Sequence, residues 1–156
     1  MNNMTPKSVY SMRLDWNLTT ETVFSFFSDS PWAILLDSAN ADHIEARYDV
    51  ICAAPIATLV NNETGTIINQ VKGRQPLVEI TGVSSCTHDS KRYQDDPFKL
   101  LKTTLAELFP VCKRSSLPFS GGAMGSFSYD LARNIEKLPN RASNDINLPK
   151  MNIGFY

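Results

Sequence analysis

The stretch LPFSGGAMGSFSYDLARNIEKLP, residues 117–139, carries the strongest indication of how this chain folds. Three of the 7 glycines in the chain fall within it, and glycine permits a positive φ or the close approach of another segment. Phe119, Phe127 and Tyr129 alternate around the glycines, which indicates a strand. We therefore expect a glycine-rich strand that packs tightly against its neighbours, with a short helical turn over Asp130–Lys137 after it.

The composition is that of a globular domain or of a piece of one. The chain has 156 residues, of which 42% are hydrophobic, enough to form a core. Its 15 basic and 16 acidic residues leave a net charge of −1, which argues against a nucleic-acid partner. No stretch approaches the roughly 18 apolar residues of a membrane span, and the first residues lack the apolar core of a secretory signal. Cys52, Cys86 and Cys112 are odd in number and widely spaced, so we expect free thiols in a reducing, cytoplasmic setting.

Apolar runs predict several strands. Trp32–Leu36 is short and continuously apolar, which is typical of a strand covered on both faces. Asn61–Gly65 separates two strand-like runs and fits a five-residue, glycine-ended hairpin loop. The polar stretch at 84–95 is expected to be a mobile loop. The expected strands are Ser8–Trp16, Trp32–Leu36, Arg47–Ala53, Ile56–Val60, Thr66–Val71, 76–80 and Lys150–Tyr156.

A first helix is expected after Thr19 or Thr20, either of which can cap its N-terminus. Val23, Phe26 and Phe27 are spaced at i, i+3 and i+4, so we expect this helix to bury one face.

A second helix is expected from Asp95-Asp96-Pro97, because an acidic cap followed by proline is a strong helix start. An apolar stripe runs from Phe98 through Leu101 and Leu105 to Leu108, and Pro110 ends it. Together with the strands, the two helices predict an α+β domain.

No complete catalytic set is present among the chemical motifs. Ser120–Gly122 could cradle a phosphate, but the lysine and hydroxyl residue of a P-loop are missing, so packing is the better interpretation. Cys86–His88 has too few partners for zinc. Asp42-His43 could form an acid–base pair with Asp130, although nothing in the sequence sets their distance. Arg47-Tyr48 could hold a carboxylate and stack on a ring, and a strand-edge salt bridge is an equal alternative.

Two blocks of sequence resemble the N-terminal part of component I of aminodeoxychorismate synthase, in the chorismate-utilising family that includes anthranilate synthase component I. The first block is the glycine-rich segment 118–139. The second comprises Pro31–Ser38, Ala41–His43, Arg47–Asp49 and Ala54-Pro55. The Ala-Asp-His followed by Arg-aromatic-Asp favours the aminodeoxychorismate branch over the anthranilate branch.

The resemblance implies a function and a fold. The full enzyme exchanges the 4-hydroxyl of chorismate for an amino group, with ammonia from a glutaminase partner subunit, and so serves folate synthesis. The chorismate site, the catalytic lysine and the magnesium-binding glutamates belong to a part of the family chain that is missing here. We therefore expect residues 1–156 to be an N-terminal domain, inactive by itself and without a cofactor of its own.

The implied architecture is two mainly antiparallel sheets packed as a sandwich with flanking helices, incomplete because the catalytic half is absent. In that case the strand at Lys150–Tyr156 would lack its partner strands. Ile153, Phe155 and Tyr156 would then be exposed or mispaired and would invite association.

The resemblance also implies a tryptophan site. The matching positions are Ser38, Glu45, Ala46, Arg47 and Tyr48. A strand-end hydroxyl can meet an ammonium or a carboxylate group, Arg47 can pair with the ligand carboxylate, and Tyr48 can wall an indole. Ala46 can contribute only its backbone. Two alternatives stay open: the N-terminal domain of an anthranilate synthase component I, and a stand-alone tryptophan-binding or interaction module.

Overall fold

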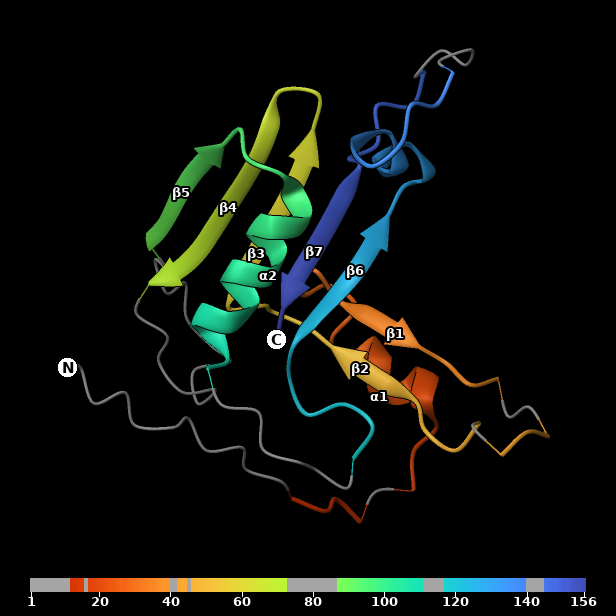
Figure 1. Ribbon diagram of the computed structural model, residues 1–156. Coiled ribbons are helices and arrows are strands. Elements are labelled where there is room, and N and C mark those ends of the chain that lie inside the picture. The colour runs from red at the N-terminus through yellow and green to blue at the C-terminus, as the bar shows by residue number, and fades with distance from the viewer. Residues whose placement is uncertain are drawn as a thin grey trace.

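The computed structural model describes residues 12–15, 17–39, 42–44, 46–72, 87–110, 117–139 and 145–156. It contains two antiparallel sheets and short helices, which confirms the predicted α+β class with two antiparallel sheets and flanking helices (Figure 1). In chain order the elements are α1 (Thr20–Ser25), β1 (Ile34–Leu36), β2 (Val50–Cys52), β3 (Ala57–Asn62), β4 (Gly65–Lys72), β5 (Thr87–Tyr93), α2 (Pro97–Leu108), β6 (Ala123–Phe127), the 3-10 helix η1 (Tyr129–Asn134) and β7 (Met151–Phe155).

The larger sheet has five strands in the order β5-β4-β3-β7-β6, all antiparallel. β7 lies inside this sheet, where Ile153 pairs with Leu59 on one side and with Gly125 on the other. Ile153 and Phe155 are 1% and 0% exposed. The expectation that this strand lacks partners is therefore wrong, because both of its neighbours come from within the 156 residues.

The chain beyond β7 is held as well. The hydroxyl of Tyr156 donates a hydrogen bond to the carbonyl of Trp32 at 2.8 Å. Burial raises the pKa of Tyr156 to about 12, with a smaller contribution from Cys52. Tyr156 was expected to be exposed, but it is half-buried and remains a protonated donor across the neutral pH range.

A tight hairpin joins β3 to β4. Only Glu63 and Thr64 lie between the two strands, since pairing continues through Asn61 with Thr66. In the buried pair, Asn61 Nδ2 donates to Thr66 Oγ1 at 2.9 Å, and Gly65 supplies a φ of 117° at the end of the turn. The prediction of a five-residue loop was wrong. Asn61, a polar residue assigned to that loop, instead hydrogen-bonds to Thr66 within the paired strands.

Helix α2 lies across one face of the five-stranded sheet (Figure 1). Its start is as predicted: the Asp96 carboxylate accepts hydrogen bonds from the backbone N–H groups of Phe98 at 2.7 Å and Lys99 at 3.1 Å. The predicted apolar stripe on this helix packs against the core. The buried core residues are Ala57, Leu59, Ile68, Leu131, Met151, Ile153 and Phe155.

The glycine-rich segment forms β6, the strand predicted there, and η1 takes the place of the predicted helical turn. Gly121 and Gly122 have φ values of 126° and 140°. Gly122 then exchanges two backbone hydrogen bonds with Tyr156, at 3.0 and 2.9 Å. The glycines thus serve packing rather than phosphate binding, as the sequence favoured.

Three other expectations were wrong for the residues described. The polar segment at 87–93 is β5 rather than a mobile loop, because it pairs along its length with β4 at the sheet edge. Edge strands carry charged residues, which hides the usual apolar alternation. β1 is not covered on both faces, since Leu36 is 50% exposed. Residues 12–15 are not in a strand. The remaining residues of the strand expected at Ser8–Trp16, which are 8–11 and 16, lie outside the described residues, as does the strand expected at 76–80.

Helix α1 is capped as predicted, with Thr19 Oγ1 accepting a hydrogen bond from the Thr22 N–H at 3.3 Å. It buries none of its residues. The helix ends at Ser25, so Phe26 and Phe27 lie beyond its last turn instead of on its face, and they are 65% and 40% exposed. None of the helices that the structure describes is long and apolar enough to span a membrane.

We predict that Gly125→Ala weakens the pairing of β6 with β7. An added Cβ would meet the carbonyl oxygen of Asn152 and would lie 2.9 Å from the Cα of Ile153, both backbone atoms that have no room to yield. The free energy of unfolding should fall by about 1–3 kcal/mol, the usual cost of overpacking. Urea denaturation measures it. Ser126→Ala, an exposed position on the same strand, is the matched control. Equal stability of the two variants would contradict the prediction.

Candidate functional site

The two segments that carry the positions predicted for the ligand site meet at one end of the two-stranded sheet. β1 and β2 pair antiparallel, with Leu36 opposite Val50. Residues just after β1 therefore lie near residues just before β2. This brings Ser38 close to the segment 46–49, although the sequence separates them by a polar loop. Glu45, also predicted for this site, lies outside the described residues.

Asp49 joins the segments that meet here. Its Oδ1 accepts two hydrogen bonds from Ser38, one from the backbone N–H and one from the hydroxyl, each at 2.9 Å. Its Oδ2 accepts a hydrogen bond from the hydroxyl of Thr20 in α1. One carboxylate thus ties the end of β1, the start of β2 and the first residue of α1 together.

These donors stabilise the charged form of Asp49. The pKa of its carboxyl is lowered, first by the backbone hydrogen bond from Ser38, and then by the hydroxyls of Thr20 and Ser38. Asp49 is therefore ionised at neutral pH and can act only as an acceptor.

Arg47 and Tyr48 form the second part of the arrangement. The guanidinium carbon of Arg47 lies 5.7 Å from the centre of the Tyr48 ring, a cation–π distance. Tyr48 is 46% exposed. Ala46 lies just before this pair, and its backbone N–H donates a hydrogen bond to the carbonyl of His43 at 3.0 Å.

An open hollow of about 520 Å³ lies beside Asp49. Glu21 and Asp37 share its wall with Asp49, so a cation fits it better than an anion does. Ser38, Arg47 and Tyr48 are not among the residues that line it. The lining residues are Leu18, Thr19, Thr20, Glu21, Asp37, Ala39 and Asp49.

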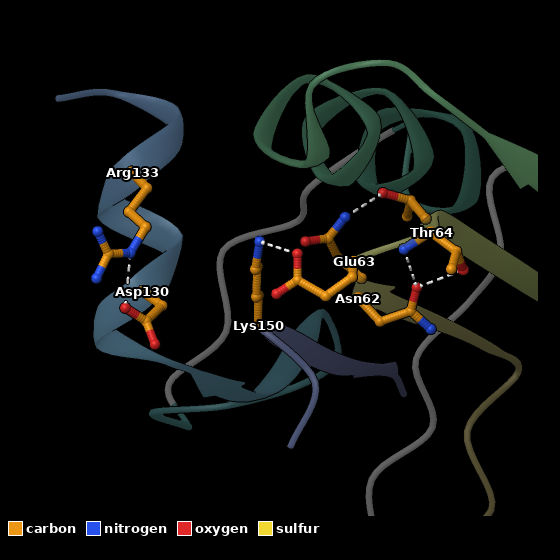
Figure 2. Close-up of polar contacts among 8 residues, drawn as sticks. Asn62, Glu63, Thr64, Asp130, Arg133 and Lys150 are labelled. Atoms are coloured by element: carbon orange, nitrogen blue, oxygen red, sulfur yellow. Dashed lines mark hydrogen bonds and ion pairs between the residues drawn. The ribbon is translucent and has the colours of Figure 1, made fainter. Parts of the chain in front are cut away.

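A second hollow, of about 360 Å³, lies at the turn between β3 and β4. Two sets of polar contacts lie at this turn (Figure 2). Lys150 Nζ is 3.1 Å from Glu63 Oε2, and Asn62 Oδ1 accepts hydrogen bonds from the N–H and the hydroxyl of Thr64, at 2.9 and 2.8 Å. An exposed ion pair of this kind contributes only about 0–1 kcal/mol. We interpret these contacts as bracing of the hairpin against the start of β7.

Other candidates from the sequence find structural roles or fall outside the structure. Asp130 is paired with Arg133 at 2.9 Å (Figure 2), and Arg133 also donates to the carbonyls of Leu138 and Pro139. These contacts hold together the segment that follows β6 and give Asp130 a structural partner. Cys86 lies outside the described residues. Within the part of the chain that is described, no group of three or more His, Cys, Asp or Glu residues could hold a metal ion.

Sequence reasoning missed Asp49 and Thr20 as members of the site. Asp49 was noticed only as part of the Arg-Tyr-Asp block that carries the family resemblance. Thr20 was noticed only as a candidate helix cap. Neither position reveals its partner, because the hydrogen bond between them joins residues that are 29 positions apart in the chain.

The chain is similar in sequence to two kinds of enzyme component among known proteins. No protein-family model matches the chain. It is 38% identical over 138 residues to aminodeoxychorismate synthase component 1 of Escherichia coli (strain K12), covering 87% of this chain and 27% of that protein. The same enzyme component of Klebsiella aerogenes is 40% identical with the same coverage. Anthranilate synthase component 1 of Acetivibrio thermocellus is 30% identical over 138 residues, which are 88% of this chain and 25% of that protein.

These matches confirm the resemblance found in the sequence motifs, with the aminodeoxychorismate synthases more similar than the anthranilate synthases. The chain spans about a quarter of the length of the curated relatives it matches.

We predict that Asp49 titrates below the ordinary aspartate pKa of about 3.9. Its stabilising contacts should be fully present above that value and should be lost as the pH falls through the lowered pKa. NMR titration of the side-chain carboxyl carbon measures this. Ser38→Ala and Thr20→Val should each move the pKa upward, whereas Thr22→Val, which touches Thr19 but not Asp49, should not. A pKa that is the same in all four proteins would show that the donors have no effect.

Proposed function

We propose that this chain, a homologue of aminodeoxychorismate synthase component 1, forms the N-terminal, non-catalytic part of such an enzyme. The observation that carries the proposal is the identity of 37–40% to aminodeoxychorismate synthases over 87% of the chain, against 30% to the anthranilate synthase of Acetivibrio thermocellus. The Arg47–Asp49 block, which favours the same branch, supplies the residues that organise the β1–β2 end of the fold.

In this proposal the whole enzyme converts chorismate to 4-amino-4-deoxychorismate, using ammonia delivered by a glutaminase subunit, for p-aminobenzoate and folate synthesis. Chorismate and magnesium bind outside these 156 residues. Residues 1–156 form the domain that precedes the catalytic one, and they supply a scaffold and a small-molecule site. The protein works in the cytoplasm, where chorismate and glutamine are available.

The small molecule that we assign to this domain is tryptophan, at the end of the β1–β2 sheet. Ser38, the backbone of Ala46, Arg47 and Tyr48 contribute, and Glu45 belongs to the same segment. The support is geometric. Antiparallel pairing of β1 with β2, together with the hydrogen bonds from Ser38 to Asp49, brings the two segments together. The guanidinium carbon of Arg47 lies 5.7 Å from the centre of the exposed Tyr48 ring. An amino acid with an indole side chain matches a guanidinium next to a ring.

The second candidate is an anthranilate synthase component 1. Matches of 30–33% identity to such proteins favour it. A growth test separates the two. The full-length product of the gene should remove the p-aminobenzoate requirement of Escherichia coli lacking aminodeoxychorismate synthase component 1. It should not remove the tryptophan requirement of a strain lacking anthranilate synthase component 1. The reverse pattern would assign the chain to the anthranilate branch.

The control for this test is the 156-residue chain by itself, which should rescue neither strain because it lacks the catalytic residues. Supplied with chorismate, magnesium and ammonium, it should form no aminodeoxychorismate by chromatography above a protein-free blank. Turnover by the short chain would show that these 156 residues are catalytic by themselves and would contradict the proposal. Failure of the full-length product in both strains would leave a stand-alone binding or interaction module as the better assignment.

We predict that Arg47→Ala in the full-length gene product weakens tryptophan binding by roughly tenfold or more, because a charge-assisted hydrogen bond is worth about 1.5–3 kcal/mol. Calorimetric titration measures the affinity. Tryptamine, which has no carboxylate, should bind the wild type and the variant equally. Arg92→Ala, which removes an arginine that donates to Thr64 far along the chain, is the control. If tryptophan binds all three proteins equally, Arg47 does not contact the ligand.

A further inference from the structure

We propose that α1, β1 and β2 form a unit that moves on a hinge at Ala54, and that Tyr156 is the latch that holds this unit against the five-stranded sheet. The closed position of the unit has a side-chain hydrogen bond between the two sheets, from the Tyr156 hydroxyl to the carbonyl of Trp32. In the open position this bond is broken. The hinge and the latch are independent of the ligand and of the enzyme branch assigned above.

The unit has few ties to the five-stranded sheet. α1, β1 and β2 precede every strand of that sheet in the chain, so among the described residues a single crossing at 53–55 joins the two parts. The hydrogen bond from Thr20 to Asp49 keeps α1 with the two strands. In the described part of the chain, no residue of β1 or β2 belongs to the apolar core, and Figure 1 shows both strands set apart from the other five. Elements with little apolar burial can open without unfolding the core.

The crossing has the geometry of a hinge. Just after it, Ile56 is fixed to the five-stranded sheet on both sides, since its N–H donates to the carbonyl of Phe155 at 2.7 Å and its carbonyl accepts the N–H of Val71 at 3.0 Å. Ala54, two positions earlier, is exposed and has a φ of 49°, which a residue with a side chain adopts at a cost in free energy. Hinges are commonly a few residues of this kind at the ends of elements.

The latch lies next to the hinge. The N–H of Ala54 donates to the carbonyl of Pro31 at 3.0 Å. The carbonyl of the following residue, Trp32, accepts the hydroxyl of Tyr156 at 2.8 Å. Trp32 has a φ of 59°, which is uncommon for a bulky residue and persists only where contacts hold it. The hydrogen bond from Tyr156 is such a contact, so its loss favours release of the Trp32 backbone and of the unit.

The five-stranded sheet supplies the fixed half of the latch. The backbone of Tyr156 exchanges two hydrogen bonds with Gly122 beside β6. The ring of Tyr156 lies over Gly154 in β7, where an added Cβ would come within 2.6 Å of the hydroxyl oxygen and 2.7 Å of two ring carbons. Gly154 therefore leaves the space that the ring needs in order to reach Trp32.

Hydrogen–deuterium exchange of the full-length gene product, measured by mass spectrometry of its peptides, tests the latch. Tyr156→Phe removes the hydroxyl and keeps the ring. Amides in β1 and β2 should then exchange about five- to tenfold faster, the effect of losing one hydrogen bond, while amides in β3 and β7 keep their wild-type rates. Gly154→Ala should act in the same direction, because its methyl group displaces the Tyr156 ring.

A matched pair of variants tests the hinge. Ala54→Gly removes the conformational cost of the positive φ in the closed position. It should therefore slow exchange in β1 and β2, both by itself and when combined with Tyr156→Phe. Ala53→Gly, at the neighbouring position without a positive φ, only adds backbone freedom and should not slow exchange.

Urea denaturation of each variant separates opening of the unit from loss of the whole fold. Wild-type exchange of β1 and β2 in Tyr156→Phe would overturn the latch. Equal acceleration in all four strands would also overturn it, because Tyr156 would then stabilise the fold as a whole. The same effect of Ala54→Gly and Ala53→Gly would overturn the hinge. If Gly154→Ala does not fold, Tyr156→Phe still decides whether the latch exists.

Discussion

The double pairing of β7 is the interaction on which the rest of the structure depends. One edge of this strand joins the β3–β4 hairpin and the other joins the glycine-rich strand β6, so parts that are distant in sequence share a single sheet. Backbone hydrogen bonds extend this pairing at the C-terminal end of β7. The N–H of Ile56 donates to the carbonyl of Phe155, and the backbones of Gly122 and Tyr156 exchange two hydrogen bonds. Because the backbone of β7 is satisfied on both edges, its side chains are free to form the core beneath α2.

The two sheets are held by different forces. The five-stranded sheet has an apolar core in which Leu59, Met151 and Phe155 are fully buried. The β1–β2 sheet has few buried side chains and is tied to α1 by polar contacts at Asp49. Segments with little apolar burial open at lower free energy than core strands. The part of the chain that carries the proposed ligand site is thus also the part whose conformation a ligand can most readily influence.

This division fits a domain that serves a larger enzyme. The sheet and α2 form the apolar core, and the polar end of β1–β2 carries the proposed ligand site. The matched residues make up about a quarter of the length of the relatives.

Local patterns in the sequence determined the α+β class, the start and apolar face of α2, the cap of α1, the packing role of the glycines and the resemblance to aminodeoxychorismate synthase component 1. Each of these depends on residues close together in the chain, such as Asp96 and Pro97. Only the tertiary structure decided that Lys150–Tyr156 is an interior strand, that the polar segment at 87–93 is an edge strand, and that Asp49 joins Ser38 to Thr20. The physical reason is the same in all three cases: strand pairing and hydrogen bonds between distant residues leave no periodic trace in the sequence of either partner.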